Sequence, residues 1–314
     1  MKKVIWLLVL VLIAAVIFYI VNRKPDCATV EFRKLTLDGE SQLLIGYSEA
    51  RNDLLYLSLS FSGDTTEFNI LTREGGAIGK GFSYGDYLTD SVMLVFDQEQ
   101  TPFLYKVGLR QLDSLHSTVN FKGLEMADIK IRKFRGRTGV FLNRGDSLTF
   151  YDILKDRSVS VFSLSKLSAK YESIKNFDVS ENKILVVLKG ECQDAGCNYD
   201  YFEVDEADAS FFKKVFTLER IKSITYPPTV SFLSPGSYVT GYSDDQAYLA
   251  KNSIDGANMK RWCLGNLKIF NTGVAQGEVY VTIVDEQIRK NTASKNPYKN
   301  LYSGISIISV ELKD

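Results

Sequence analysis

The chain has 314 residues, of which 45% are hydrophobic and 12% aromatic, so it can form two average domains or one large all-β domain. Lys and Arg together number 38, as do Asp and Glu, and the formal net charge is zero. Because acidic and basic residues are interspersed, no overall field would attract a polyanion, and we expect no nucleic-acid partner.

Residues 1–24 are predicted to form an N-terminal signal anchor, separate from a folded domain of residues 25–314. Val4–Val21 is an uncharged run of 18 residues, which is long enough to cross the hydrocarbon core as one transmembrane helix. A cleaved signal peptide has a shorter apolar region followed by a small-residue cleavage site, and Tyr19 and Trp6 are placed instead as interfacial anchors. An unusual cleaved signal and a buried soluble helix are the alternatives.

The four cysteines indicate the compartment better than the charges flanking the anchor, which are nearly balanced. Their number is even, and the spacing of Cys192 and Cys197 suits a disulfide across a hairpin loop. The alternative is four reduced structural cysteines in a cytosolic domain. We favour export, because disulfides persist in oxidising compartments. The prediction is therefore a single-pass membrane protein whose C-terminal domain lies outside the cytoplasm, either in the bacterial periplasm or at the cell surface.

From Cys27 onward, alternating and β-branched runs separated by turn residues predict strands almost throughout. The runs fall into five sets of four and a final set of three. The first two sets are looser than the others, and the second is expected to end with the strand Ser117–Phe121. The sets span Gln42–Phe82, Tyr84–Phe121, Ile129–Leu164, Ile174–Leu218, Thr229–Leu264 and Leu267–Leu312.

One strand-like phrase predicts how these sets close. It ends three of the sets, as Ser158–Leu164, Phe212–Leu218 and Met259–Leu264, and a similar phrase, Val30–Leu37, lies alone near the N-terminus. Sets of four strands repeating every 42 to 54 residues or so are typical of propeller blades. Since the last set lacks its fourth strand, we predict an all-β, six-bladed β-propeller closed by the N-terminal strand. Closure would remove the exposed sheet edges.

The two remaining cysteines fall at the predicted seam. Cys27 directly precedes the borrowed strand, and Cys263 lies in the last strand of the fifth set, so we predict a Cys27–Cys263 disulfide. A zinc site is a poor alternative, because these cysteines are solitary and His116 is the only histidine.

In this pattern, residues Thr29–Asp314 resemble six-bladed propellers of the TolB-like or NHL-like kind. The resemblance rests on the strand pattern alone, since the Trp-Asp and Gly-His signatures of WD repeats and the double glycines of kelch repeats are absent. It implies the architecture and no functional residue. A pair of β-sandwich domains is the alternative, although no Pro/Gly-rich linker divides the chain near its middle.

Motifs for catalysis and cofactor binding are absent from the sequence: it has no nucleophile elbow, phosphate-binding loop, dinucleotide fingerprint or zinc-protease pair. We predict no catalytic residue and no cofactor, and the sequence identifies no small-molecule ligand. His116 is interpreted as an exposed loop residue, and the segment that begins at Asp178 as a turn between two strands.

Acidic pairs near strand ends are the weak candidates for a metal site. Asp244, Asp245 and Asp285 are placed where propeller loops project, and paired carboxylates can bind calcium or act as acid and base. Solvated turn carboxylates are the alternative explanation, and they also account for the acidic run that starts at Asp205.

The segment Arg289–Asn300 carries four cations and no acid. Arg289, Lys290, Lys295 and Lys299 are predicted to dock on an acidic partner or on anionic lipid headgroups. A mobile, soluble insertion is the alternative.

Together these observations favour a non-enzymatic binding or scaffolding ectodomain, tethered to the membrane by its N-terminal helix and presenting a propeller face to a protein partner. Envelope assembly, adhesion, sensing and toxin neutralisation all fit this class. The alternative is a propeller enzyme that acts on a saccharide or a peptide through carboxylates in the central channel.

Overall fold

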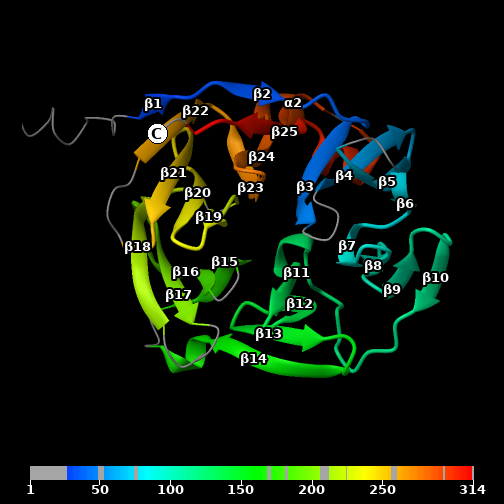
Figure 1. Cartoon of the computed structure of the whole chain (residues 1–314). Coiled ribbons are helices and arrows are strands. Elements are labelled where there is room, and N and C mark those ends of the chain that lie inside the picture. The colour runs from blue at the N-terminus through cyan, green and yellow to red at the C-terminus, as the bar shows by residue number, and fades with distance from the viewer. Residues whose placement is uncertain are drawn as a thin grey trace, which may run out of the picture.

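The computed structural model describes residues 27–48, 53–73, 77–167, 171–180, 183–205, 212–223, 225–255, 260–292 and 294–312. Within these ranges the strands form six sheets arranged in a ring (Figure 1). A hollow lined by inner strands of several sheets lies at its centre, and we call it the channel. The predicted all-β, six-bladed propeller is therefore confirmed. The predicted anchor of residues 1–24 lies outside the described residues, and no helix of the described part is long and apolar enough to span a membrane.

Each blade is an antiparallel meander that begins at the channel and ends at the rim. Two short helices, α2 (Glu286–Asn291) and α3 (Pro297–Tyr302), join β24 to β25, and two 3-10 helices span Met126–Asp128 and Leu164–Lys166. The strands of the successive blades are β3 (Ser41–Ser48), β4 (Asp53–Ser62), β5 (Thr65–Thr72) and β6 (Ala77–Lys80); β7 (Tyr84–Thr89), β8 (Val92–Phe96), β9 (Pro102–Lys106) and β10 (Gln111–Ser114); β11 (Ile129–Phe134), β12 (Arg137–Asn143), β13 (Ser147–Asp152) and β14 (Arg157–Ser163); β15 (Ser173–Ser180), β16 (Lys183–Gln193), β17 (Gly196–Asp205) and β18 (Phe212–Ile221); β19 (Thr229–Ser234), β20 (Ser237–Ser243), β21 (Ala247–Ser253) and β22 (Lys260–Gly265); and β23 (Lys268–Ala275), β24 (Glu278–Val284) and β25 (Ile305–Val310).

The fourth strand of the second blade differs from the prediction. It is β10, and the predicted strand Ser117–Phe121 belongs to the loop that follows. Phe121 is buried there, with its ring centroid 5.2 Å from that of Phe96 and 6.1 Å from that of Tyr151. The apolar alternation in this segment therefore fills the space between the second and third blades.

The N-terminal segment closes the ring as predicted. Strand β2 (Phe32–Lys34) pairs with β25 in antiparallel register, and the amide of Leu35 extends the pairing by donating to the carbonyl of Ile307 at 3.0 Å. Strand β1 (Ala28–Thr29) adds a fifth strand to the fifth blade by parallel pairing with β22, which the sequence analysis did not predict. One N-terminal segment thus joins two neighbouring blades.

Both predicted disulfides are present. Cys27 is bonded to Cys263 of β22, which fastens the N-terminal segment to the fifth blade. Cys192 is bonded to Cys197, its cross-strand neighbour at the end of the β16–β17 hairpin. All four cysteines are therefore oxidised.

The core lies between the blades, where the second strands are covered on both sides. The run Ile184–Leu188 of β16 shows this, because every one of its five side chains is buried, which explains why the hydrophobic run is unbroken. Aromatic rings fill the next gap: Phe141 and Phe150 of the third blade lie 5.1 Å apart, and Phe141 also contacts Phe177 of the fourth.

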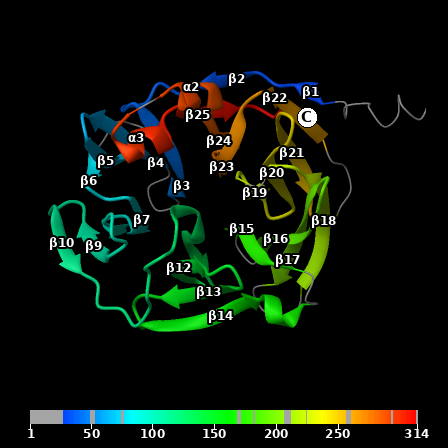
Figure 2. The ribbon, with the colours of Figure 1, turned by 180° about the vertical axis from the view of Figure 1, so that it is seen from behind.

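The ring has two distinct faces. The loops that enter each first strand and the loops that join second to third strands emerge on one side, which we call the entry face; there the Lys268 ammonium group donates to the carbonyl of Asp244. The other hairpins emerge on the exit face, where the amide of Ile254 donates to the carbonyl of Gly236. Helices α2 and α3 belong to the entry face, which is turned toward the viewer in Figure 2.

Candidate functional site at the entry face and in the channel

A cavity of about 450 Å³ opens on the entry face, and we call it the entry-face cavity. Its walls come from inner strands, from the loops before β11 and β19, and from both helices. The side chains that give it its apolar character are Leu124, Tyr226, Phe270, Tyr298, Leu301 and Tyr302. A concave, largely apolar surface with a few polar groups is typical of binding sites.

Large apolar side chains remain exposed around this cavity. Leu301 is 54% exposed, Tyr298 39% and Phe270 36%. The aromatic wall is nevertheless held in place, because the Tyr298 ring packs edge-on against Phe68 at 5.4 Å and stacks on Tyr302 at 6.4 Å. Exposed apolar surface on a rigid frame is typical of interaction sites.

The α2–α3 segment is an ordered part of the entry face. Asn296 caps α3, is fully buried, and donates through its side-chain amide to the carbonyl of Thr65 in the first blade at 2.9 Å. The carboxylate of Asp285 caps α2 by accepting from the amides of Gln287 and Ile288. The segment therefore packs on a neighbouring blade through Asn296.

The four predicted docking cations differ in their surroundings. Arg289 lines the entry-face cavity, with its guanidinium 5.7 Å from the centre of the Tyr226 ring and Nη2 3.2 Å from Glu286. Lys290 also approaches Glu286 but is exposed and lies outside the cavity lining. Lys299 approaches Glu40 at 3.8 Å, and Lys295 is exposed. Only Arg289 thus combines a fixed position with access to the cavity.

The candidate metal-binding carboxylates serve loop structure. Asp244 accepts from the amide of Lys222 at 3.2 Å, and Asp245 accepts from the hydroxyl of Tyr248 at 2.7 Å. Both lie between β20 and β21, whereas Asp285 caps a helix in the next blade. Among the described residues no group of three His, Cys, Asp or Glu side chains is placed to hold a metal ion.

His116 and Asp205, the two other predicted loop positions, do not line the entry-face cavity. His116 is exposed in the loop after β10, and the neighbouring Asp113 forms an ion pair with Lys106 at 2.8 Å. Asp205 ends β17 on the exit face, and residues 206–211 lie outside the described ranges.

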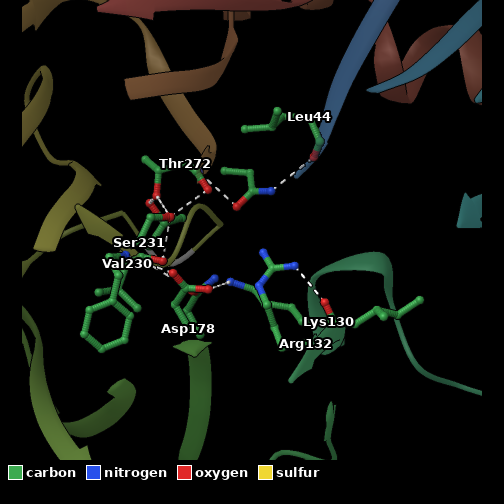
Figure 3. Close-up of polar contacts among 12 residues, drawn as sticks. Leu44, Lys130, Arg132, Asp178, Val230, Ser231 and Thr272 are labelled. Carbon is green, nitrogen blue, oxygen red and sulfur yellow. Dashed lines mark hydrogen bonds and ion pairs between the residues drawn. The ribbon is translucent and has the colours of Figure 1, made fainter. Parts of the chain in front are cut away.

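The channel holds a polar cluster that the sequence analysis missed (Figure 3). Asp178 was interpreted as a turn residue, but it lies in β15 with its carboxylate 3.4 Å from the Lys130 ammonium group and 2.9 Å from the amide of Phe232, which donates to it. Arg132 approaches Asp86 at 3.7 Å. Burial lowers the pKa of Lys130, with a further contribution from the Arg132 charge, and Asp178 opposes this shift.

Hydroxyl and amide groups continue this cluster around the ring (Figure 3). Ser231 donates to the carbonyl of Thr272 at 3.0 Å, the side chain of Asn271 donates to the carbonyl of Leu44, and Thr282 accepts from the amide of Leu44. Each bond satisfies a backbone or side-chain group of a neighbouring blade, so these residues link the inner strands. The available sequence signal was polar residues at alternate positions of a set's first strand, as in Lys130 and Arg132.

Comparison with known proteins supports the fold. No protein-family model matches the chain, and no curated protein matches it. Among solved structures, regucalcin, a calcium-binding protein from Agrobacterium tumefaciens, is 12% identical with a TM-score of 0.52, over 91% of this chain and 97% of that one. YCF48 bound to D1 peptide is 8% identical with a TM-score of 0.51, over 92% and 99%. An oligogalacturonate lyase in complex with manganese is 10% identical with a TM-score of 0.45, over 80% and 72%. At these identities the likeness concerns the fold alone.

Proposed function

We propose that this protein is a membrane-anchored, non-enzymatic binding module, a TolB-like or NHL-like propeller that presents its entry face to a protein partner. The observation that carries the proposal is the entry-face cavity, whose exposed Leu301, Tyr298 and Phe270 adjoin the ordered cationic helices. Aromatic residues and arginine are enriched at protein interfaces and at their hot spots. Envelope assembly, adhesion, sensing and toxin neutralisation are roles that such a module can perform.

The enzyme alternative depends on channel carboxylates, and Asp178 and Asp86, which lie on inner strands of the described residues, are both engaged. Asp178 has Lys130 as its ion-pair partner and accepts from the amide of Phe232, while Asp86 approaches Arg132. Contacts of this kind hold both carboxylates in the wall formed by the inner strands. This arrangement favours a structural role for the channel and binding at its mouth.

The path of the N-terminal segment supports a tether on the far side of the ring. Strand β22 follows an exit-face loop, and β1 runs parallel to it, so the chain enters the fold at the rim from the exit-face side. A transmembrane helix before Cys27 would therefore leave the entry face open to a partner. The two disulfides support an oxidising compartment outside the cytoplasm for this domain.

Site-specific photo-crosslinking in intact cells tests the proposal. A photoreactive amino acid replaces Leu301 at the entry-face cavity or, as a matched control, Leu154, which is 94% exposed in the β13–β14 turn. We expect a discrete crosslinked protein from position 301 and none from position 154. Crosslinking from position 154 alone, or from neither position, would contradict a partner at the entry face.

A further inference from the structure

We propose that the partner contributes a short peptide segment that places an apolar side chain in the entry-face cavity and a neighbouring carboxylate against Arg289. This inference rests on the proposed function and adds the chemistry of the segment that binds. Of the four cations in residues 289–300, it assigns recognition of the carboxylate to Arg289 alone.

The apolar half of the segment follows from the cavity walls. A volume of about 450 Å³ lies within the range of pockets that enclose small ligands. Phe270, Tyr298 and Leu301 keep a third to a half of their surfaces exposed there. Because removing exposed apolar surface from water is favourable, an apolar side chain is the group that these walls favour.

The acidic half follows from the geometry of Arg289. Its guanidinium is oriented by Glu286 on one side and by the Tyr226 ring on another, and the side chain is still 26% exposed. A guanidinium has five N–H donors in a rigid fork, and the hydrogen bond to Glu286 uses Nη2. A fixed fork of this kind matches the two oxygens of a carboxylate.

Tyr226 provides a second, independent observation at the same wall. It is only 5% exposed and lies beside Arg289, and its O–H has no acceptor among the residues that the structure describes. Burial raises the pKa of this hydroxyl, with a smaller contribution from the Glu286 charge, while the charge and a hydrogen bond of Arg289 oppose the rise. An unsatisfied buried donor is costly, and a carboxylate bound beside it is a suitable acceptor.

Charge and position favour a protein segment over a lipid surface. Glu125 also lines the cavity, so the wall is not uniformly cationic as a site for anionic headgroups would be. The helices lie on the entry face, whereas the chain enters the fold from the exit-face side. A protein segment with one carboxylate near an apolar side chain fits both the mixed charge of the wall and its position on the entry face.

Selection from a library of displayed random short peptides, with the purified full chain as bait, tests the inference. We expect the enriched peptides to share a large apolar residue close to an Asp or Glu. Arg289→Gln should weaken the best peptide by about tenfold or more, because a hydrogen bond to a charged group is lost. Arg289→Lys should recover only part of this loss, since the fork is replaced by a point charge.

Lys290→Gln is the matched control, because it removes the same charge from the same helix outside the cavity; binding should stay near the wild-type value. Unchanged urea midpoints for all variants would show that the fold persists. Enriched peptides without acidic residues, equal binding by Arg289→Gln, or no enrichment would overturn the inference. So would vesicles of anionic phospholipid that bind the wild type and release Arg289→Gln. If position 301 still crosslinks a partner in any of these cases, the proposed function stands and only this inference fails.

Discussion

The two disulfides close loops of very different lengths, and this difference predicts how much each one stabilises the ring. Cys27 and Cys263 are 236 residues apart, whereas Cys192 and Cys197 are 5 apart. In the chain-entropy model a cross-link over the longer loop contributes about 5 kcal/mol, and one over the shorter loop about 2 kcal/mol. Removing the seam disulfide should therefore cost about 3 kcal/mol more than removing the hairpin disulfide.

The strands around the two disulfides also make the loss of Cys27–Cys263 the more destabilising of the two. Strand β1 has only two paired residues, so without its disulfide it has little to hold it on β22. The hairpin cysteines lie instead at the end of a long ladder between β16 and β17. We choose alanine over serine as the replacement, because Cys197 is 1% exposed and a serine there would bury a hydroxyl group.

Urea unfolding of Cys27→Ala/Cys263→Ala and Cys192→Ala/Cys197→Ala measures the difference. Far-UV circular dichroism follows the whole ring, and the fluorescence of buried Trp262, which is paired with Ala28, follows the seam. We expect the larger drop in the free energy of unfolding for the seam variant by both probes. An equal drop in the two variants, or a larger one in the hairpin variant, would refute the argument.

Three further predictions concern the seam, the channel and the buried tyrosines. Leu35→Ala should lower the free energy of unfolding by about 2–4 kcal/mol, because Leu35 is buried, while Phe32→Ala on the same segment should have little effect because Phe32 is 44% exposed; urea midpoints compare them. Asp178→Ala should lower the free energy of unfolding by about 3–5 kcal/mol, because it leaves Lys130 without its ion-pair partner and only 14% of the Lys130 side chain is exposed. Recovery of most of this loss in a double variant with Lys130→Met would confirm that the ion pair is the cause. Burial, together with a hydrogen bond to Glu278, raises the pKa of Tyr280 from 10.0 to about 12, so the stability contributed by its neutral form is fully present below pH 10.0 and is lost as the pH rises from 10.0 through about 12. Tyr280→Phe should therefore flatten the alkaline fall in stability by close to one proton, and an unchanged slope in urea titrations would count against the assignment.

The sequence predicts the ring well because its signals are local and repeated. Four strands separated by turns recur at nearly constant length, and the solitary phrase at Val30–Leu37 leaves one place for it to pair. The cysteines at positions 27 and 263 mark the same seam. Physical closure of a sheet ring admits few other arrangements, so the pattern specifies the architecture without any family signature.

Other features depend on contacts between distant residues, which strand patterns do not record. The alternation at Ser117–Phe121 is that of a strand, yet Phe121 is needed between Phe96 and Tyr151, and the loop takes that place. The residues around Asp178 have the composition of a turn. Its carboxylate forms an ion pair with Lys130 because the third and fourth blades are adjacent, which no local pattern indicates.

The entry-face cavity has the same origin. Its walls come from segments as far apart in sequence as Leu43 and Tyr302, and no local pattern brings them together. The cationic composition around Arg289 was visible in the sequence, whereas its orientation by Tyr226 was not.

The borrowed strand also sets the order of events during synthesis. Lys34 pairs with Ile308, so β2 emerges from the ribosome roughly 270 residues before its partner strand. At 5–20 residues per second, about 15–55 s of translation separates the two. During that interval the first five blades can form and β1 can pair with β22, but β2 and the edge of the last blade stay unpaired. The ring can therefore close only when β25, the last strand, has been synthesised. The Cys27–Cys263 disulfide needs only the fifth blade, which contains Cys263.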